Sequence, residues 1–229
     1  MVTTLRLGVA MIPLRDINPS HRTPFVTIGI IVVNVAVFAF EFLLPSEMLN
    51  PLAFSWGLVP KRLVDLEPLA LVTVLTSMFL HSGPAHLLGN MLYLWIFGDN
   101  IESAMGSFRF MLFYLMCGIG AALGQILVNP LSTIPMIGAS GAISGVLGSY
   151  LVLYPRAEVE TLVFLGYFAR LVRLPTVVVL GSWIVLQLFS GVLSLGMSAT
   201  GGVAWFAHIG GFAAGIVLVG LFRRRRWWE

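Results

Sequence analysis

Long apolar runs separated by short polar segments dominate the pattern of this chain. Five runs approach the length of about 20 residues that a helix needs to cross a bilayer, and a sixth is shorter but rich in small and apolar residues. The five cover 24–44, 85–104, 108–128, 177–195 and 203–222, and the shorter one covers 140–154. The pattern therefore predicts an all-α membrane protein, built as a bundle of six transmembrane helices.

The segment between the first two runs, 45–84, is unusually long. It is polar enough to stay outside the membrane, yet it is rich in Leu and Pro and contains Phe54 and Trp56. Two placements are open for this first loop, which we expect on the extracytoplasmic side. It either lies in the lipid headgroup layer or forms a plain surface loop.

Composition supports a membrane protein, because the chain is 58% hydrophobic and only 10% charged, whereas soluble domains carry about 25% charged residues. The one cysteine, Cys117, excludes an internal disulfide framework and offers no zinc cluster. We expect it to be a small apolar residue within a span. The net charge of +3 does not indicate nucleic-acid binding, because the basic residues are segregated by membrane side.

The distribution of Lys and Arg predicts the orientation. With the N-terminus in the cytoplasm, only Lys61 and Arg62 of the 13 basic residues fall on the outer side, as the excess of positive charge in cytoplasmic loops requires. Both termini are then cytoplasmic. We expect a cytoplasmic tail over 1–23, the six-span domain over 24–222 and a basic cytoplasmic tail over 223–229.

Glycines at four-residue spacing mark three of the predicted helices. Such pairs allow two helix backbones to approach closely within a membrane. Close packing of the fourth and sixth spans would bring Ser140 next to His208. The pairs are Gly120 and Gly124, Gly141 and Gly145, and Gly211 and Gly215.

Several polar side chains share one depth. Ser140, His208 and His86 each lie fourteen residues before the predicted inner end of their helix, which is about 21 Å at the helical rise. Asn90 lies one turn deeper on the same face as His86. An interhelical hydrogen bond explains any one of them equally well, but polar groups at membrane depth usually face the bundle interior. The set therefore predicts a shared water-filled cavity that opens outward.

Two of these groups form a candidate nucleophile and base. A serine hydroxyl reacts once a neighbouring base takes its proton, and His208 is such a base for Ser140. No Asp or Glu lies between Glu160 and Glu229, so the usual orienting carboxylate is absent from this part of the sequence. The prediction is a Ser–His dyad.

Hydrogen-bond donors for an oxyanion are also present. The helix that begins around Gly138 and Ser140 offers free backbone N–H groups at its N-terminus. His86 and Asn90 can donate further hydrogen bonds to a developing negative charge. Hydrolysis of a peptide bond is the simplest reaction that uses this set.

Three motifs resemble those of the rhomboid family of intramembrane serine proteases. Residues 138–142 match its G-x-S-G motif, residues 207–211 its A-H-x-x-G motif, and residues 81–90 its H-x4-H-x3-N pattern. Residues 11–16 also resemble the start of many bacterial members, and six spans are the basic bacterial form. The resemblance covers nearly the whole chain.

The resemblance implies a role for each matched residue. Ser140 would be the nucleophile and His208 the general base, and His86, Asn90 and the Ser140 backbone amide would form the oxyanion hole. Gly138, Gly141 and His81 would be structural residues near the site. Glu102 matches a structural carboxylate at the inner end of the second span. No cofactor and no metal is implied.

Two features depart from the family pattern. A Trp-Arg pair of some members is replaced here by Val72 and Thr73, so the first loop must be anchored differently. The Tyr that stacks on the catalytic His in the best-known bacterial enzymes is replaced by Ser144. Trp205 and Phe206 are the nearby aromatic candidates for orienting the imidazole.

The resemblance implies a serine endopeptidase that cleaves single-pass transmembrane substrates near the outer face of a bacterial inner or plasma membrane. The lipid bilayer is its expected surrounding, with no nucleic-acid or metal partner. One alternative is a catalytically silent rhomboid-like protein that binds membrane clients, although such proteins usually lack the Ser or the His. Another is a small channel or transporter with His81, His86 and His208 along its path. That path would need polar residues in the inner halves of spans four and six, which are almost wholly apolar.

Overall fold

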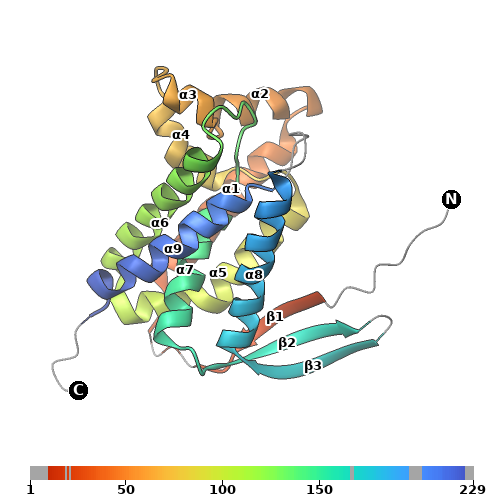
Figure 1. The fold of residues 1–229 in the computed structure, drawn as a ribbon, viewed down its shortest axis with the longest axis vertical. Helices are drawn as coiled ribbons and strands as arrows, with labels where there is room; N and C mark the ends of the chain where they lie inside the picture. The colour runs from red at the N-terminus through yellow and green to blue at the C-terminus, as the bar shows by residue number, and fades with distance from the viewer. Residues whose placement is uncertain (1–9, 19, 21, 166–167, 196–202, 225–229) are drawn as a thin grey trace.

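Helices form a bundle with a small three-stranded sheet at one end (Figure 1). This is a computed structural model, and it describes residues 10–18, 20, 22–165, 168–195 and 203–224. The helices are α1 Phe25–Leu43, α2 Ser46–Trp56, α3 Pro60–Val64, α4 Ala70–Thr76, the 3-10 helix η1 Ser77–Phe79, α5 Pro84–Met105, α6 Ser107–Val128, α7 Ser140–Leu153, α8 Thr176–Ser194 and α9 Trp205–Phe222. The strands are β1 Ala10–Asp16, β2 Glu158–Leu165 and β3 Phe168–Pro175.

Four of the described helices, α1, α6, α8 and α9, are long and apolar enough to cross a membrane. Helix α5 and the segment Ala70–Phe79, which meet at a bend of 83°, together form a fifth candidate span. The fourth predicted span, 140–154, corresponds to α7, which has 14 residues. The chain is therefore an integral multi-pass membrane protein, and the predicted helical membrane bundle is confirmed in its overall class.

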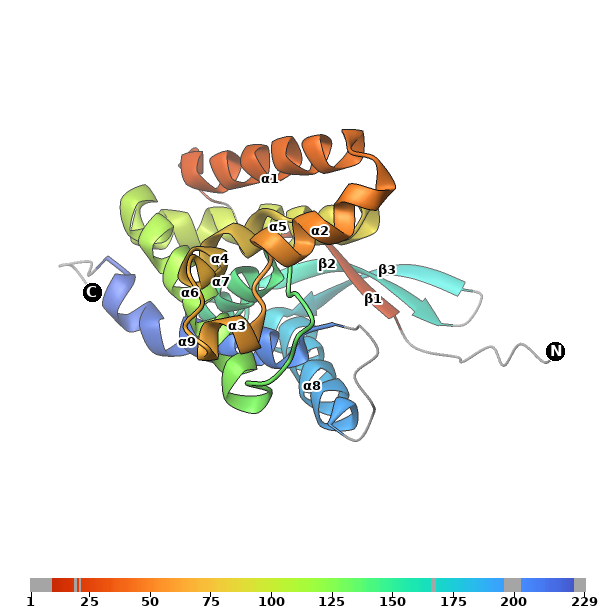
Figure 2. The ribbon, with the colours of Figure 1, turned by 90° about the horizontal axis from the view of Figure 1, so that it is seen from above.

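Helix α7 lies at the centre of the bundle and contacts α5, α6, α8 and α9. Its residues 142–150 are all buried. Seen from above, α1 and α8 lie on opposite sides of the molecule (Figure 2). Four helices therefore enclose the buried turns of this short helix.

Glycines set the distance between α7 and α9. A Cβ atom on Gly211 would overlap the carbonyl oxygen of Gly141, and one on Gly215 would overlap that of Gly145. The two backbones are thus in direct contact, as the four-residue spacing of these glycines predicts. One turn before Gly211, His208 lies level with the first turn of α7.

The sheet has the order β1-β2-β3 and is antiparallel throughout. One face, with Pro13, Val159 and Thr161, is buried. The other face exposes Ile12 and Leu171. Because β2 directly follows α7 in the sequence, the sheet lies at the end of α7 away from Ser140.

The sequence pattern did not predict this sheet. Residues 10–16 were expected within an N-terminal tail, and 158–175 were expected to form a loop. Instead, β1 pairs with β2 across about 150 residues of sequence, with Ile12 opposite Leu162. Residues 1–9, 19, 21 and 225–229 of the expected tails lie outside the described residues.

The segment 45–84 is folded into α2, α3, α4 and η1 at the other end of the bundle (Figure 1). Leu58 and Met136 exchange backbone hydrogen bonds of 3.0 and 2.8 Å, which tie this segment to the loop before Ser140. Its side chains include Leu66 and Leu71, which are 85% and 75% exposed. Such exposed apolar groups favour the headgroup layer over a plain surface loop.

Candidate active site

Ser140 and His208 meet at the crossing of α7 and α9. Ser140 is the first residue of α7, and His208 lies in the first turn of α9. The Ser140 Oγ atom lies 2.8 Å from His208 Nε2. This distance is within the range at which a base takes a proton from a nucleophile. The pair predicted from the sequence is brought into contact, although 68 residues separate its members.

The second nitrogen of the imidazole has a partner on α8. His208 Nδ1 lies 2.8 Å from Gln187 Oε1. The ring centroid of Trp183, one turn earlier on α8, is 6.0 Å from that of His208, with an angle of 37° between the ring planes. Neither Gln187 nor Trp183 was singled out from the sequence.

A signal for Gln187 existed in the sequence. It is the only amide or ionisable side chain in the predicted span 177–195, and such side chains within spans usually face the bundle interior. Of the two aromatic candidates, Trp205 lies edge-on to His208 at 6.3 Å, with an interplanar angle of 89°. The Phe206 ring packs beside Gly191 of α8.

His86 and Gly138 face each other across the site. A Cβ atom at Gly138 would lie 2.7 Å from both Cε1 and Nε2 of His86, and Gly138 has a φ of 122°, which favours glycine. Ser82 donates its backbone N–H to His86 Nδ1 at 3.4 Å, and its hydroxyl lies 3.1 Å from the same atom. Because the N–H only donates, the imidazole proton belongs on Nε2, facing Gly138.

Asn90 is held by a chain of hydrogen bonds through His81. His81 Nδ1 lies 3.3 Å from the Phe79 carbonyl oxygen, which only accepts, so Nδ1 carries the proton. His81 Nε2 then accepts from Asn90 Nδ2 at 2.9 Å. The amide keeps a second N–H for the site.

Glu41 is a further residue that sequence reasoning missed. It is 6% exposed, and its carboxylate oxygens accept the backbone N–H of His81 at 3.1 and 3.3 Å. A carboxylate near the end of an apolar run is the signal that could have identified it. Glu41 ties α1 to the segment that leads into α5, and so fixes the loop that carries His81.

The residues beside Ser140 have packing roles. Gly141 has no room for a side chain, because a Cβ there would lie 2.6 Å from the Ala121 Cβ of α6. Ser144, one turn after the nucleophile, donates its hydroxyl to the carbonyl of Ser140 at 2.6 Å. Its side chain therefore bonds along its own helix.

Six of the predicted site residues line one cavity of about 1430 Å³: Ser140, His208, His86, Asn90, Gly138 and Gly141. Gln187 and Trp183 line it as well. Helix α7 begins at this cavity with Ser140, and the first bond of its series runs from the Ile143 N–H to the Ala139 carbonyl. The N–H groups before Ile143 are the ones that a helix start leaves without an intrahelical partner. The residues predicted as nucleophile, base and oxyanion donors thus surround one space.

The part of the chain that the structure describes holds no group of three or more His, Cys, Asp or Glu side chains arranged to hold a metal ion. Cys117 is a buried free thiol in α6. It packs against Gly145 of α7.

Comparison with known proteins identifies similar sequences. A family model described as the rhomboid domain matches residues 68–225. RHOMBOID-like protein 4 of Arabidopsis thaliana is 35% identical over 145 residues, which are 63% of this chain and 32% of that protein. Rhomboid-like protein 11, chloroplastic, of the same organism is 32% identical over 157 residues, 65% of this chain and 51% of that protein.

A bacterial relative matches a shorter stretch. Rhomboid protease GluP of Bacillus subtilis (strain 168) is 45% identical over 78 residues, 34% of this chain and 15% of that protein. In all three relatives the matched part is about half of the protein or less.

Proposed function

Because the chain belongs to the rhomboid family, whose members are intramembrane serine proteases, we propose that it is a serine endopeptidase that cleaves transmembrane segments. Ser140 and His208 are its catalytic dyad. The observation that carries the proposal is the 2.8 Å contact between Ser140 Oγ and His208 Nε2 at the edge of a cavity of about 1430 Å³.

The reaction begins with attack of Ser140 Oγ on the scissile carbonyl carbon while His208 Nε2 takes the hydroxyl proton. The carbonyl oxygen becomes an oxyanion. When the C–N bond breaks, the imidazolium gives its proton to the leaving amine and an acyl-enzyme remains. A water molecule then attacks the ester, with His208 as base, and Ser140 is regenerated with release of the carboxylic acid.

Three donors stabilise the oxyanion in this scheme: the Ser140 backbone N–H, His86 Nε2–H and the second N–H of Asn90 Nδ2. The hydrogen bonds to His86 Nδ1 and from Asn90 to His81 support this assignment. They leave one N–H of each side chain available. The His86 and Asn90 side chains are both fixed by these hydrogen bonds before substrate binds, so little reorganisation accompanies the appearance of charge on the oxyanion.

We also propose how the protein is oriented in the membrane. Arg15, Arg170 and Arg173 lie in the sheet, whereas Lys61 and Arg62 lie in α3 at the opposite end of the bundle (Figure 1). With the sheet in the cytoplasm, the basic side chains follow the positive-inside rule. The six-span plan, cytoplasmic termini and a cavity open to the extracytoplasmic side of a bacterial inner or plasma membrane complete the proposal.

The substrates we propose are single-pass transmembrane proteins whose helix unwinds near the outer face. A closed helix satisfies its own carbonyl groups, so only an unwound segment can present one to Ser140. The lipid bilayer surrounds both proteins during the reaction, and no nucleic acid, cofactor or metal takes part.

Cleavage by the reconstituted protein tests the proposal. Wild type and Ser140→Ala are placed in liposomes with a single-span substrate, and fragments are scored by mass spectrometry. Wild type should give fragments and Ser140→Ala should give none. Ser182→Ala, which removes a hydroxyl that bonds the Val179 carbonyl in α8, is the matched control and should cleave normally. Undiminished cleavage by Ser140→Ala would contradict the mechanism.

A further inference from the structure

We propose that Gln187 is a positioning residue for His208, in the place that an orienting carboxylate has in a catalytic triad. This inference rests on the proposed function. Ser140 Oγ, the imidazole and the Gln187 side chain are joined by two contacts of 2.8 Å each. The three residues come from α7, α9 and α8, so the arrangement depends on the packing of three helices.

The chemistry of the groups determines which atom donates and which accepts in each of the two contacts. An amide oxygen only accepts hydrogen bonds. With Gln187 Oε1 facing Nδ1, the proton of neutral His208 belongs on Nδ1, and the lone pair belongs on Nε2. That lone pair faces the Ser140 hydroxyl, so Gln187 selects the one neutral tautomer in which His208 can act as base.

The surroundings of α8 show that Gln187 is directed inward. Its side chain is buried, 8% exposed, whereas Val185 and Leu186 just before it are 61% and 59% exposed. A polar side chain at membrane depth is unfavourable unless it has a partner. A neutral amide supplies an acceptor for Nδ1–H without placing a second charge in the bilayer, which makes it a suitable substitute for a carboxylate here.

Helix α8 contacts the imidazole in two ways. Trp183 and Gln187 are four residues apart and therefore project from the same face. Trp183 lies against the ring with its plane inclined by 37°, and Gln187 binds the Nδ1 edge. Helix α7 offers no aromatic ring at position 144, where Ser144 bonds to the Ser140 carbonyl. Orientation of His208 is therefore assigned to α8.

Gln187→Leu tests the assignment, because leucine has a similar size and no acceptor. In liposomes, we expect kcat for the single-span substrate to fall about 10- to 100-fold, with KM nearly unchanged. The loss stays at or below the lower limit of the roughly 10²–10⁴-fold that a positioned base contributes, because His208 itself is retained. Val185→Leu, on the exposed face of the same helix, is the matched control and should behave as wild type.

The tautomer gives a readout that does not need activity. In protein labelled with ¹⁵N at histidine, His208 should show a protonated Nδ1 and an unprotonated Nε2, identified by loss of the signals in His208→Ala. Gln187→Leu should lose this single-tautomer signature, while the signals of His81 and His86 stay in place and report an intact fold.

Gln187→Glu is the second variant and keeps an acceptor of the same shape. Above neutral pH it should be at least about 10-fold more active than Gln187→Leu. The acid limb of its pH–kcat profile should move to higher pH, because a nearby carboxylate favours the protonated imidazole.

Separate outcomes test the proposed protease function and the positioning role of Gln187. If wild type does not cleave, the proposed function fails. If wild type cleaves, but Gln187→Leu matches Val185→Leu in kcat and in the His208 spectrum, only the role of Gln187 is overturned. Equal inactivity of Gln187→Glu and Gln187→Leu would also overturn it, because a hydrogen-bond acceptor at this position would then not contribute to catalysis.

Discussion

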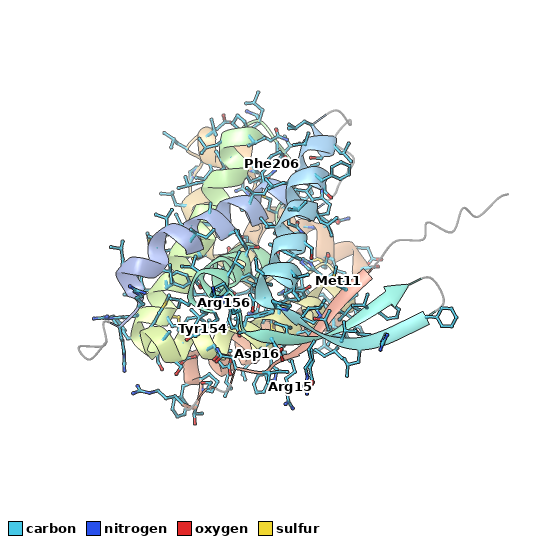
Figure 3. The ribbon with its side chains drawn as sticks, turned by 60° about the horizontal axis from the view of Figure 1, so that its bottom comes forward. Met11, Arg15, Asp16, Tyr154, Arg156 and Phe206 are labelled. Atoms are coloured by element: carbon cyan, nitrogen blue, oxygen red, sulfur yellow. The ribbon has the colours of Figure 1, made fainter. Side chains whose placement is uncertain are left out.

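Two polar clusters lie at opposite ends of α5 and α7, and they differ in what their hydrogen-bonding groups face. The site cluster consists of Ser140, His208, His86 and Asn90, at the ends where both helices begin. The sheet cluster consists of Asp16, Asn100, Glu102 and Tyr150, near the sheet. In Figure 3 the sheet end comes forward, and Asp16 lies far from Phe206, which neighbours the site cluster.

The carboxylates of the sheet cluster are occupied by protein donors. Glu102 accepts the N–H groups of Val26 and Thr27 at 3.0 and 2.8 Å, and the hydroxyls of Thr27 and Ser107 at 2.9 and 2.7 Å. Asp16 accepts Asn100 Nδ2 and the Tyr150 hydroxyl, each at 2.7 Å. Glu102 joins α1, α5 and α6, and Asp16 joins β1 to α5 and α7.

The site cluster instead directs N–H donors and the Ser140 hydroxyl, the proposed nucleophile, into a cavity of about 1430 Å³. Polar residues within the bundle thus have two different roles. Where protein groups occupy their acceptors, the residues stabilise the fold; where donors face open space, they are available to a substrate. Substitutions at the site cluster should therefore change activity more than stability, and those at the sheet cluster the reverse.

His208→Ala should have the largest effect. It removes the proposed base, and loss of one member of a catalytic unit lowers kcat by roughly 10⁴-fold or more in a soluble serine protease. Cleavage of the single-span substrate in liposomes measures this. The thermal unfolding midpoint in detergent should stay close to wild type. A large loss of stability would show that His208 belongs to the fold, and would remove the contrast between the clusters.

Asn90→Ala should have the next largest effect. One oxyanion donor is worth roughly 10²–10³ in kcat, and the substitution leaves His81 Nε2 without its donor. Steady-state kinetics should show the loss in kcat with a small change in KM. A change confined to KM would mean that Asn90 binds substrate and does not stabilise the oxyanion.

Glu102→Gln should affect stability and not chemistry. The amide cannot accept from all four donors, and hydrogen bonds to a charged group are worth about 1.5–3 kcal/mol each. We expect a lower unfolding midpoint by tryptophan fluorescence, with kcat within a few-fold of wild type at a temperature where the variant is folded. A loss of kcat as large as that of Asn90→Ala would contradict the separation of the two clusters.

Asp16 should give the smallest effect, visible as a pH dependence. Burial raises the pKa of Asp16 above its ordinary value of 3.8, although the Tyr150 hydroxyl opposes the shift. A raised pKa means that the folded state holds the proton more tightly than the unfolded state. The contribution of this proton to stability is present at low pH and is lost as pH rises through 3.8 toward the pKa of the folded state.

The unfolding midpoint of wild type relative to Asp16→Asn measures the contribution of the Asp16 proton to stability. As pH increases from 3.8, the midpoint of wild type should fall relative to that of Asp16→Asn. Only wild type has a carboxyl at position 16 that ionises in this range. A constant difference across this range would show that the carboxyl is not perturbed.

The apolar helices and most of the site residues could be predicted from the sequence, because both signals are local. A run such as 203–222 needs no partner to be recognised, and a histidine within it is conspicuous. The glycines opposite one another in α7 and α9 explain why Ser140 and His208 meet, since Gly211 tolerates no side chain against Gly141.

The remaining features depend on contacts between distant segments. Strand β1 pairs with β2 across much of the chain, and the short alternating pattern of 158–165 gives little signal beside long apolar runs. Gln187 was visible as the one amide in its span. Its role depends on where α8 packs against α9, which no local pattern encodes. Glu41 likewise acquires its role through the backbone of His81.

The most direct test of the account is covalent labelling of Ser140. A fluorophosphonate probe reacts with a serine that a neighbouring base activates and leaves unactivated serines unmodified. Wild type in liposomes should be labelled once, at Ser140 by peptide mass mapping, with no labelling of Ser140→Ala or His208→Ala and normal labelling of Ser182→Ala. Equal labelling of wild type and His208→Ala, or an adduct at another serine, would contradict the dyad at the junction of α7 and α9.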